Sequence, residues 1–355
     1  MSIDEKYMYR CLQLACNGRG FVAPNPMVGA VVVCEGKIIG EGFHRQYGKA
    51  HAEVNAINSV KDQSLLKKST IYVSLEPCSH YGKTPPCARL IIDSGIPRVV
   101  IACLDPYPSV SGRGIQMLRD AGVEVIVGVM EKEAQTLNRE FFTAQIENRP
   151  YIYLKWAQTQ DGFIDKKRVT GEIPKPTPIS NDFMRILVHK KRAEVSAIMI
   201  GTNTAVNDNP SLTTRFWYGQ NPVRVVLDRQ ARIPSNYSLF SGEVETIVFT
   251  EQDVYARSLK NVTFVKVDFG DTLFKSVFFF LRQRKINSIL VEGGKELLQS
   301  LIDEKMWDEA YVEISGLTFN EGVEAPGIDG FLLEDHKWGT SKQAHLAVRD
   351  NYKIL

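Results

Sequence analysis

Short apolar runs alternate with amphipathic segments along the first half of the chain. This pattern predicts strands at residues 28–34, 37–43, 70–75, 98–103 and 123–129. It predicts helices at residues 4–16, 51–60, 87–94, 114–120 and 131–147. Pro85 and Pro86 precede one of these helices, and Gly95 follows it, as is typical of helix ends. The alternation of strand and helix predicts a mostly parallel or mixed sheet that is covered by helices.

The second half restarts with a strand at 151–157 and continues as α/β. Further strands are predicted at 197–200, 223–227, 246–249, 262–267, 288–291 and 309–314, and helices at 181–192, 273–284 and 295–305. The chain has 355 residues, which favours two domains. We place the boundary at Asn148-Arg149-Pro150, so that the predicted domains are 1–148 and 149–355.

The composition excludes several classes of protein. The net charge is +2, from 43 basic and 41 acidic residues, so the chain lacks the basic surface of a nucleic-acid-binding protein. The apolar run 277–281 is too short to span a membrane, and the N-terminus lacks the pattern of a signal peptide. Six cysteines in a chain of this length do not indicate a fold that depends on disulfide bonds. We therefore expect a cytoplasmic protein.

The strongest chemical signal is His51-Ala52-Glu53 followed by Pro77-Cys78 and Cys87. One imidazole and two thiolates form a three-ligand zinc site with a fourth position open for water, as catalytic zinc requires. We predict one zinc ion per chain, held by His51, Cys78 and Cys87. The competing interpretation is a buried histidine and two core cysteines that fall in this order without binding metal.

Glu53 follows the histidine by two residues and is predicted to be catalytic rather than a ligand. A non-ligand glutamate that moves protons, beside a metal-activated water, is the signature of zinc deaminases. His51 and the cysteines lie near the starts of two predicted helices, where thiolate is favoured over thiol. The spacing departs from the usual two residues, because eight residues separate Cys78 from Cys87.

Two strand-to-glycine turns mark the second half. Residues 288–294 form an apolar strand that ends in Glu292-Gly293-Gly294, and residues 200–204 contain a similar turn at Gly201. Such turns allow a phosphate to approach the backbone at a helix N-terminus, but they also occur in ordinary packing. Neither turn has the Gly-x-Gly-x-x-Gly pattern, so a standard dinucleotide-binding fold is not indicated.

The inserted segment between the cysteines resembles one family. Residues 76–87 match Glu-Pro-Cys-x-His-x-Gly-Lys-Thr-Pro-Pro-Cys, the pattern of the bifunctional riboflavin-biosynthesis deaminase–reductases, at every fixed position. Residues 24–29 and His44 resemble upstream motifs of the same family. The resemblance implies a cytidine-deaminase-like three-layer α/β/α domain, followed by a dihydrofolate-reductase-like α/β domain. Within the first domain, we take Asn25, His44 and Lys83 as candidates for orienting substrate.

Segments of the second half resemble the reductase part of this family. The similar segments are 155–157 with Asp161-Gly162, 201–215 and 290–294. The resemblance implies contacts with NADPH at Ala157, Thr204, Asp208 and Gly294. It implies substrate contacts at Arg192, Leu212, Arg215 and Glu292, and Lys155 on its strand is a further candidate. Arginine suits the ribose phosphate because a guanidinium binds an oxyanion through two donors. The competing interpretation of Arg192, Arg215 and Lys155 is that they are surface charges.

Two positions depart from the family pattern. The family has Ser-x-Trp-Ile-Thr/Ser before the helix that carries Arg192, whereas this chain has Pro176-Thr177-Pro178-Ile179-Ser180 and therefore lacks the tryptophan that contacts cofactor. In the other domain, Tyr107 replaces an asparagine of the family's Asp-Pro-Asn-Pro. The first departure affects the packing around nicotinamide, and the second affects one substrate contact.

The resemblance implies a bifunctional enzyme with a small-molecule substrate. The first domain would deaminate 2,5-diamino-6-(5-phosphoribosylamino)-4(3H)-pyrimidinone with zinc, and the second would reduce the ribosyl chain with NADPH to give 5-amino-6-(5-phosphoribitylamino)uracil. We expect a homo-oligomer and no nucleic-acid or membrane partner. Two alternatives stay open: a deaminase whose second domain only binds ligand or builds an oligomer, and a nucleic-acid deaminase.

Overall fold

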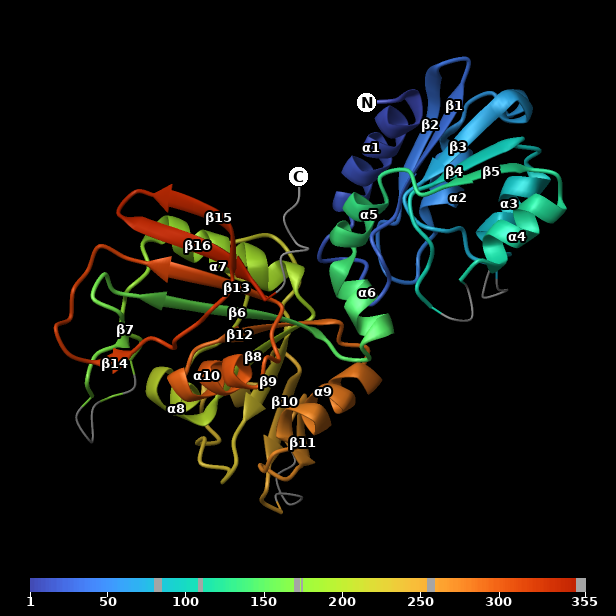
Figure 1. Ribbon diagram of the computed structural model, residues 1–355. Coiled ribbons are helices and arrows are strands. Elements are labelled where there is room, and N and C mark those ends of the chain that lie inside the picture. Colours follow the sequence, from blue (N-terminus) through green and yellow to red (C-terminus); the bar gives the residue numbers. More distant parts are fainter. Residues whose placement is uncertain (80–84, 108–110, 169–172, 174, 254–258, 349–355) are drawn as a thin grey trace. The chain divides into compact units, whose positions relative to one another are not determined.

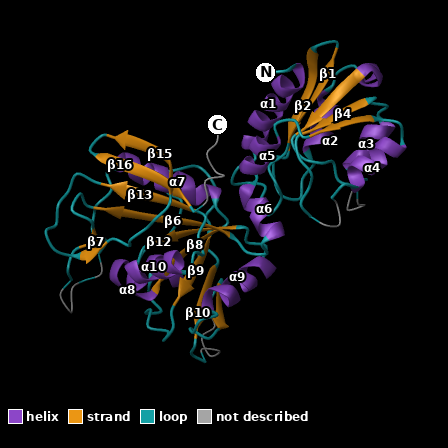
Figure 2. Cartoon of the chain, in the orientation of Figure 1, coloured by secondary structure: helices purple, strands orange, loops and turns teal. Residues whose placement is uncertain are grey.

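The computed structural model describes residues 1–79, 85–107, 111–168, 173, 175–253 and 259–348. The described chain divides into two compact units, of which the first is Met1–Asn148 and the second begins at Arg149. Helices flank a central sheet in each unit (Figures 1 and 2). Within the described residues, no helix combines the length and apolar character needed to cross a membrane.

The first unit contains a five-stranded sheet in the order β2-β1-β3-β4-β5. Its strands are β1 (Gly29–Cys34), β2 (Lys37–Phe43), β3 (Ser69–Val73), β4 (Arg98–Ile101) and β5 (Glu124–Val127). Its helices are α1 (Ile3–Cys16), α2 (Ala52–Ser59), α3 (Cys87–Asp93), α4 (Arg113–Asp120), α5 (Glu131–Leu137) and α6 (Arg139–Ile146). Strands β3, β4 and β5 are parallel, whereas β1 is antiparallel to both β2 and β3.

Both faces of this sheet are buried. Ala30 and Val32 of β1 pack with residues of α2, α3 and α4, whereas Val31 and Val33 pack with residues of α1 and α5. The alternation follows from the two-residue period of a strand, which points successive side chains to opposite faces. Figure 1 shows α1 and α5 on one side of the sheet and α3 and α4 on the other. The predicted three-layer α/β/α arrangement is confirmed.

The helix predicted at 131–147 is two helices, because the chain leaves helical geometry at Asn138, where φ is −103° and ψ is 21°. The Asn138 side chain accepts a hydrogen bond from Met27 N (2.7 Å) and donates one to Met27 O (2.9 Å). It therefore holds the loop that contains Asn25. The apolar period of the segment does not reveal this distant partner.

The second unit contains a nine-stranded sheet in the order β11-β10-β9-β8-β12-β6-β13-β16-β15. The strands are β6 (Tyr151–Gln158), β8 (Ala197–Gly201), β9 (Val223–Leu227), β10 (Thr246–Thr250), β11 (Val262–Lys266), β12 (Ser288–Glu292), β13 (Glu309–Ile314), β15 (Phe331–Trp338) and β16 (Ser341–Ala347). The helices are α7 (Asp182–Glu194), α8 (Thr202–Asp208), α9 (Leu273–Gln283) and α10 (Lys295–Asp303), and β7 (Phe163–Asp165) pairs with β14 (Val323–Glu324).

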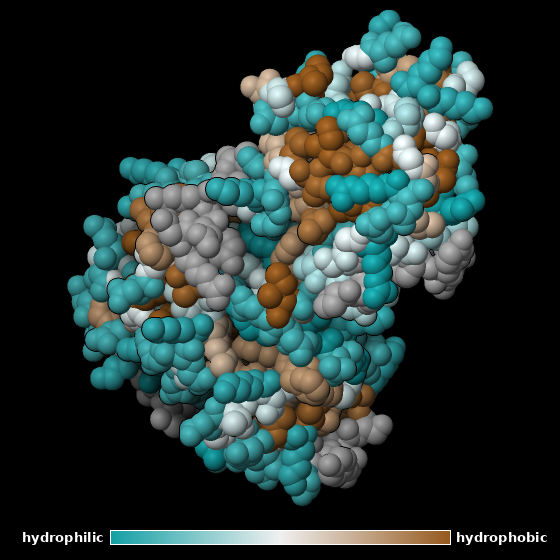
Figure 3. Space-filling view, turned by 45° about the vertical axis from the view of Figure 1, so that its right-hand side comes forward, coloured by the Kyte–Doolittle hydropathy of each residue, from teal (hydrophilic) through white to brown (hydrophobic). Residues whose placement is uncertain are grey.

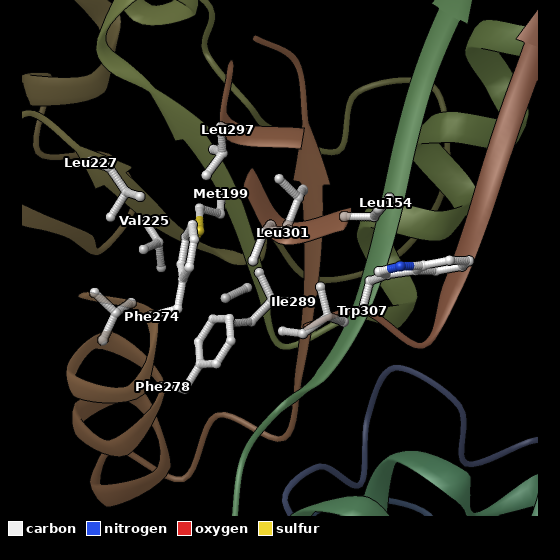
Figure 4. Packing of buried hydrophobic residues seen from close by; sticks show 14 of the residues in the cluster. Leu154, Met199, Val225, Leu227, Phe274, Phe278, Ile289, Leu297, Leu301 and Trp307 are labelled. Atoms are coloured by element: carbon white, nitrogen blue, oxygen red, sulfur yellow. The ribbon is translucent and has the colours of Figure 1, made fainter. Parts of the chain in front are cut away.

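The strands from β11 to β13 are parallel, and the hairpin β15–β16 adds two antiparallel strands at one edge. The largest core lies between the sheet and α9 and α10. Phe274 and Phe278 of α9, with Leu297 and Leu301 of α10, pack against strand residues such as Met199 (Figure 4). The other face carries α7 and α8, whose Ala205 belongs to a second core.

The sequence pattern did not predict β15 and β16. Phe331–Trp338 is mostly exposed, and Phe331 and Leu332 each expose about half of their surface. A solvated edge strand is not constrained to the apolar and polar alternation that reveals a half-buried strand. Hydrophobic side chains are exposed among hydrophilic ones on the face of the molecule in Figure 3.

Candidate functional sites

Two helix starts meet in the first unit and bring the predicted zinc ligands together. His51 is the residue before α2, and Glu53 lies in the first turn of that helix. Cys78 follows β3 in the chain, and Cys87 is the first residue of α3. Ala88 N donates to Cys78 O (3.2 Å), so the start of α3 also holds the backbone of Cys78 in place.

The three ligand atoms are spaced as a zinc site requires. His51 Nδ1 lies 3.6 Å from Cys78 Sγ and 3.3 Å from Cys87 Sγ. Tetrahedral zinc, with bonds of about 2.0–2.1 Å to nitrogen and about 2.3 Å to sulfur, separates such atoms by about 3.6 Å. In the described part of the chain, this is the one group of three or more His, Cys, Asp or Glu residues whose ligand atoms lie within 4.8 Å of one another. The residues therefore fit zinc.

The charges of this cluster also favour a cation. The neighbouring Cys87 thiol lowers the pKa of Cys78 to about 4, whereas the thiolate of Cys78 raises the pKa of Cys87. Hydrogen bonding to Cys78 raises the pKa of His51 to about 9. Two adjacent thiolates repel each other, and a positive charge between them relieves this repulsion. A divalent cation supplies that charge and allows both cysteines to be deprotonated.

Glu53 lines the same pocket and is only 3% exposed. Burial raises its pKa to about 7, because a carboxylate loses hydration when it is enclosed. A carboxyl group that titrates near neutral pH is suited to accept and donate protons. The pocket has a volume of about 330 Å³ and is small enough to enclose a single ring.

His44 and Asn25 lie in this pocket and fix each other's orientation. His44 Nδ1 lies 3.0 Å from Ala50 O, and a carbonyl only accepts, so Nδ1 carries the proton. His44 Nε2 is then the acceptor for the Asn25 amide at 3.2 Å. Burial lowers the pKa of His44, which keeps the ring neutral. Asn25 is therefore left with its carbonyl oxygen as the group that it can offer to a ligand N–H.

Lys83, the third predicted substrate contact, lies outside the described residues. Other pocket residues were not identified from the sequence, namely Leu75, Asp105, Phe141 and Gln145. Phe141 and Gln145 belong to α6. The sequence carried no signal for them, since their helix is far from the zinc motif in the chain. Tyr107, noted only as a departure, also lines the pocket.

The second unit has a cleft of about 1310 Å³ beside the carboxyl ends of β6, β8, β9 and β12. Ligands of parallel α/β sheets bind at such ends. The cleft is lined by all nine residues predicted for the reductase site: Lys155, Ala157, Arg192, Thr204, Asp208, Leu212, Arg215, Glu292 and Gly294. The segment that replaces the tryptophan motif, 176–180, lines it as well.

Arg192 and Glu292 are bound to each other. The distances are 2.9 Å from Nε to Oε1 and 2.6 Å from Nη2 to Oε2, and Nη1 donates to Thr213 O (3.2 Å). Burial alone would raise the pKa of Glu292, but the Arg192 guanidinium outweighs it and lowers that pKa. Lys155 is the register partner of Glu292 across β6 and β12, so the two side chains leave the sheet on one face. A substrate would meet an ionised carboxylate flanked by two cations.

Asp208 is also paired within the protein. Arg168 Nη2 donates to Asp208 Oδ1 at 2.8 Å, and Arg168 Nε donates to Asp165 Oδ2 at 2.8 Å. Burial raises the pKa of Asp208, and the nearby Arg168 opposes the shift. A cofactor amide or hydroxyl that reaches Asp208 would share this carboxylate with Arg168.

The predicted cofactor positions Thr204 and Gly294 come together. Gly293 and Gly294 have φ values of 90° and 77°, which favour glycine. A Cβ atom at Gly293 would lie 3.1 Å from Thr204 Cγ2, and one at Gly294 would lie 3.2 Å from Thr204 Oγ1. The turn therefore packs closely on α8 while it opens the N-terminus of α10 to the cleft, where backbone N–H groups suit a phosphate.

His189 of α7 was not identified from the sequence. Its Nδ1 accepts a hydrogen bond from Arg215 N (2.9 Å), and the ring lines the cleft. Burial, together with Arg192 and Arg215, lowers its pKa to about 4, so the ring stays neutral and keeps an acceptor. Leu212, in the same loop, has a positive φ of 51°. Helix α7 thus holds a loop in an unusual conformation through His189 and through Arg192.

Comparisons with known proteins cover both units. Residues 1–103 match the cytidine and deoxycytidylate deaminase zinc-binding region, and residues 150–327 match the RibD C-terminal domain. The chain is 43% identical to the riboflavin biosynthesis protein RibD of Aquifex aeolicus over 324 residues, which are 90% of this chain and 89% of that protein. It is 35% identical to the protein of the same name from Escherichia coli, over 88% of this chain and 87% of that one.

Solved structures agree with the sequence matches. A diaminohydroxyphosphoribosylaminopyrimidine deaminase/5-amino-6-(5-phosphoribosylamino)uracil reductase from Thermotoga maritima superposes with a TM-score of 0.88 at 38% identity, covering 97% of this chain and 98% of that one. Acinetobacter baumannii RibD gives a TM-score of 0.86 at 30% identity, with the same coverage. Both matches span the two units.

Proposed function

The chain belongs to the RibD family of riboflavin biosynthesis proteins, and from that premise we propose which residues carry each of its reactions. The protein is a bifunctional enzyme, with a deaminase fold of the cytidine deaminase type in its first unit and a dihydrofolate-reductase-like reductase in its second. The substrate that we propose is 2,5-diamino-6-(5-phosphoribosylamino)-4(3H)-pyrimidinone. The product would be 5-amino-6-(5-phosphoribitylamino)uracil.

The observation that carries the deaminase assignment is the N···S spacing of 3.6 and 3.3 Å around His51, with the buried Glu53 in the same pocket. His51, Cys78 and Cys87 would hold one zinc ion per chain. Zinc with an open position supplies activation of a water molecule. Glu53 accepts a proton from that water and returns protons to the ring nitrogen and the departing amine, so that a C–O bond replaces a C–N bond and ammonia leaves.

Asn25 and His44 would orient the pyrimidine in this reaction. Because the Asn25 amide group donates to His44, the Asn25 carbonyl oxygen is the group that would accept an N–H of the ligand. The pyrimidinone carries such donors, including its amines. Lys83 remains a proposed phosphate contact, since a lysine in the inserted loop can reach an oxyanion.

In the second unit, NADPH would supply hydride to C1′ of the ribosyl group, whose ring oxygen gains a proton as the chain opens to ribityl. Ala157, Thr204, Asp208 and Gly294 would contact the cofactor. Arg192, Leu212, Arg215 and Glu292 would contact the substrate, with Lys155 beside Glu292 at the reacting end. The charges in the cleft suit a phosphorylated, hydroxyl-rich ligand.

One assay tests whether the second unit catalyses the reduction. The deaminated pyrimidine phosphate and NADPH are given to the unaltered protein, and oxidation of the reduced cofactor is followed by absorbance. We expect turnover. If no NADPH is consumed while the diamino substrate still releases ammonia, segment 176–180 fails to replace the missing tryptophan, and the second unit is catalytically silent. The nucleic-acid deaminase alternative is not favoured, because the matches span both units.

We also propose a cytoplasmic location and a homo-oligomer. The exposed edge strand β15, with Phe331, Leu332 and Trp338 partly open to solvent, is a surface that copies of a chain commonly cover. Sedimentation of the purified protein measures the oligomeric state directly.

A further inference from the structure

Glu76 is a buried carboxylate that lies outside the chemistry proposed above. It directly precedes Pro77-Cys78 and is 4% exposed. Its two carboxylate oxygens accept hydrogen bonds from four backbone N–H groups. The distances are 3.3 Å from Asp105 N and 3.0 Å from Gly112 N to Oε2, and 3.0 Å from Gly114 N and 3.4 Å from Ile115 N to Oε1.

One oxygen of this carboxylate joins two backbone positions. Oε2 accepts hydrogen bonds from Asp105 N and from Gly112 N. Between these points, Tyr107 N donates to Asp105 Oδ1 (2.8 Å), and both side chains line the zinc pocket. Glu76 therefore holds Asp105, and through it the Asp105–Tyr107 wall of the pocket.

The other oxygen fixes the start of α4. Gly114 and Ile115 are the second and third residues of that helix, and their N–H groups are those that an N-cap side chain usually satisfies. Gly112, at the cap position, has no side chain, so Glu76 takes over this role from another segment. A Cβ atom at Gly114 would lie 2.0 Å from Pro77 O, which shows how closely α4 meets the Glu76-Pro77 peptide.

The metal ligands are held by other contacts. Cys87 N donates to Cys78 Sγ (3.3 Å), and Ala88 N donates to Cys78 O (3.2 Å), so α3 positions Cys78. His51 and Glu53 belong to the start of α2. The hydrogen bonds that hold Cys78 thus differ from those that Glu76 accepts from Asp105 and Gly112.

We infer that Glu76 is a positioning residue of the deaminase, which holds the Asp105–Tyr107 wall against the bound pyrimidine and so determines substrate affinity rather than the chemical step. This inference rests on the deaminase function proposed above. An amide in place of the carboxylate presents an NH₂ group to backbone N–H donors, so part of the clamp is replaced by donor–donor repulsion.

The test compares Glu76→Gln with the unaltered full-length protein in steady-state deamination, with activity expressed per bound zinc. We expect KM to rise on the order of tenfold, while kcat per zinc stays within about twofold. A residue needed only for folding would lower the active fraction and leave KM unchanged. Glu76→Asp keeps the charge but is one methylene shorter, and we expect an intermediate KM. If Glu76→Gln retains no zinc, the KM of Glu76→Asp tests the inference in its place.

Two controls accompany these variants. Asp62→Asn removes an exposed carboxylate that caps Ser64 N at 3.0 Å in the same unit, and we expect no change in KM. Tyr107→Ala alters the wall itself, and its effect on KM should be less than additive with Glu76→Gln because both act through one loop. An unchanged KM in both Glu76 variants, a fall in kcat alone, or full additivity overturns the inference. Absence of deamination in the unaltered protein instead refutes the proposed function.

Discussion

The two sites of this protein are built in opposite ways. In the first unit, the residues that we propose as zinc ligands come from two short motifs, and their ligand atoms lie close enough to share one metal ion. In the second unit, the site is a wide cleft in which two charged pairs, Arg192 with Glu292 and Arg168 with Asp208, bind each other. The first site therefore has ligand atoms that are arranged for one ion, whereas the paired charges of the second site would have to be shared with a ligand.

This difference predicts different responses to substitution. A metal site loses its function when a single ligand is removed, because the open geometry needs all three. A cleft with several separate charged pairs loses binding energy in steps, because pairs that share no partner contribute almost independently. Removal of metal ligands at the first site should therefore abolish deamination, and single changes at the second site should reduce reduction of the substrate by NADPH.

The largest effect is expected from Cys78→Ala combined with Cys87→Ala. Only His51 of the three ligands remains, so zinc should be lost and deamination abolished. NADPH-dependent reduction of the deaminated substrate should continue, because the cleft belongs to the other unit. Elemental analysis and the two separate assays measure this. A full zinc complement in the double variant would refute the ligand assignment.

Glu53→Gln should come next. The shape is kept and the proton-transfer group is removed, so deamination should fall by roughly 10²-fold or more, the usual contribution of a positioned acid–base group. Zinc content should stay at the level of the unaltered protein, since Glu53 is not a ligand. Turnover close to normal would show that protons travel by another path.

Asp208→Ala is expected to have a smaller effect, confined to the second unit. A charge-assisted hydrogen bond contributes about 1.5–3 kcal/mol, so kcat/KM for NADPH should fall by on the order of tenfold or more. Deamination should be unchanged. Arg168→Ala is the matched variant, because it removes the internal partner of Asp208 and leaves the carboxylate for the cofactor. Equal deamination and reduction losses in Asp208→Ala would contradict the separation of the sites.

His189 provides a pH-dependent test of the second site. Its pKa is about 4 in the folded protein, because of burial and the nearby arginines, whereas an unfolded histidine has a pKa of about 6.5. The unfolded chain therefore binds the proton more readily, and the free energy of unfolding should fall as pH drops from about 6.5 towards 4, by at most about 3 kcal/mol.

His189→Gln keeps an acceptor for Arg215 N but does not titrate, so this part of the pH dependence should disappear. Denaturant unfolding followed by tryptophan fluorescence measures it in the full chain. All four tryptophans, Trp156, Trp217, Trp307 and Trp338, lie in the second unit, so the signal reports that unit alone. An identical pH profile in both proteins would show that the fold does not lower the pKa of His189.

The smallest effect is expected from separating the units. Residues 1–148 contain all the described residues of the deaminase pocket and a complete five-stranded sheet. The fragment should fold and deaminate at a rate per zinc close to that of the whole chain. Circular dichroism and ammonia release measure this. An insoluble or inactive fragment would show that the units depend on each other.

The sequence indicated the candidate zinc ligands and Glu53 because these residues lie within contiguous motifs. His51, Glu53, Cys78 and Cys87 were identified directly, and the structure brings them together. The contributions of Phe141 and Gln145 were not predictable, since a helix reaches the pocket only through tertiary packing. In the second unit, the cleft residues were found by family resemblance, and no pattern indicated that Arg168 or His189 would bind to them.

The same contrast holds for the fold. Buried strands such as β9 and β13 were predicted at their observed bounds, because continuous apolar runs specify them. The exposed hairpin β15–β16 and the break at Asn138 were missed. Both depend on partners that lie far away in the chain, namely β13 for β16 and Met27 for Asn138.

The strand order of the second sheet also bears on how the protein is made. Strand β6 is the first of its unit to be synthesised, yet its neighbours are β12 and β13, and Tyr151 pairs with Ser288. Strand β16, the last that the structure describes, lies inside the sheet between β13 and β15. During translation, the first unit has all its strands before β6 appears, whereas β6 exposes unpaired edges until most of the second unit has emerged. The reductase half is therefore the part of the nascent chain that most needs protection from aggregation.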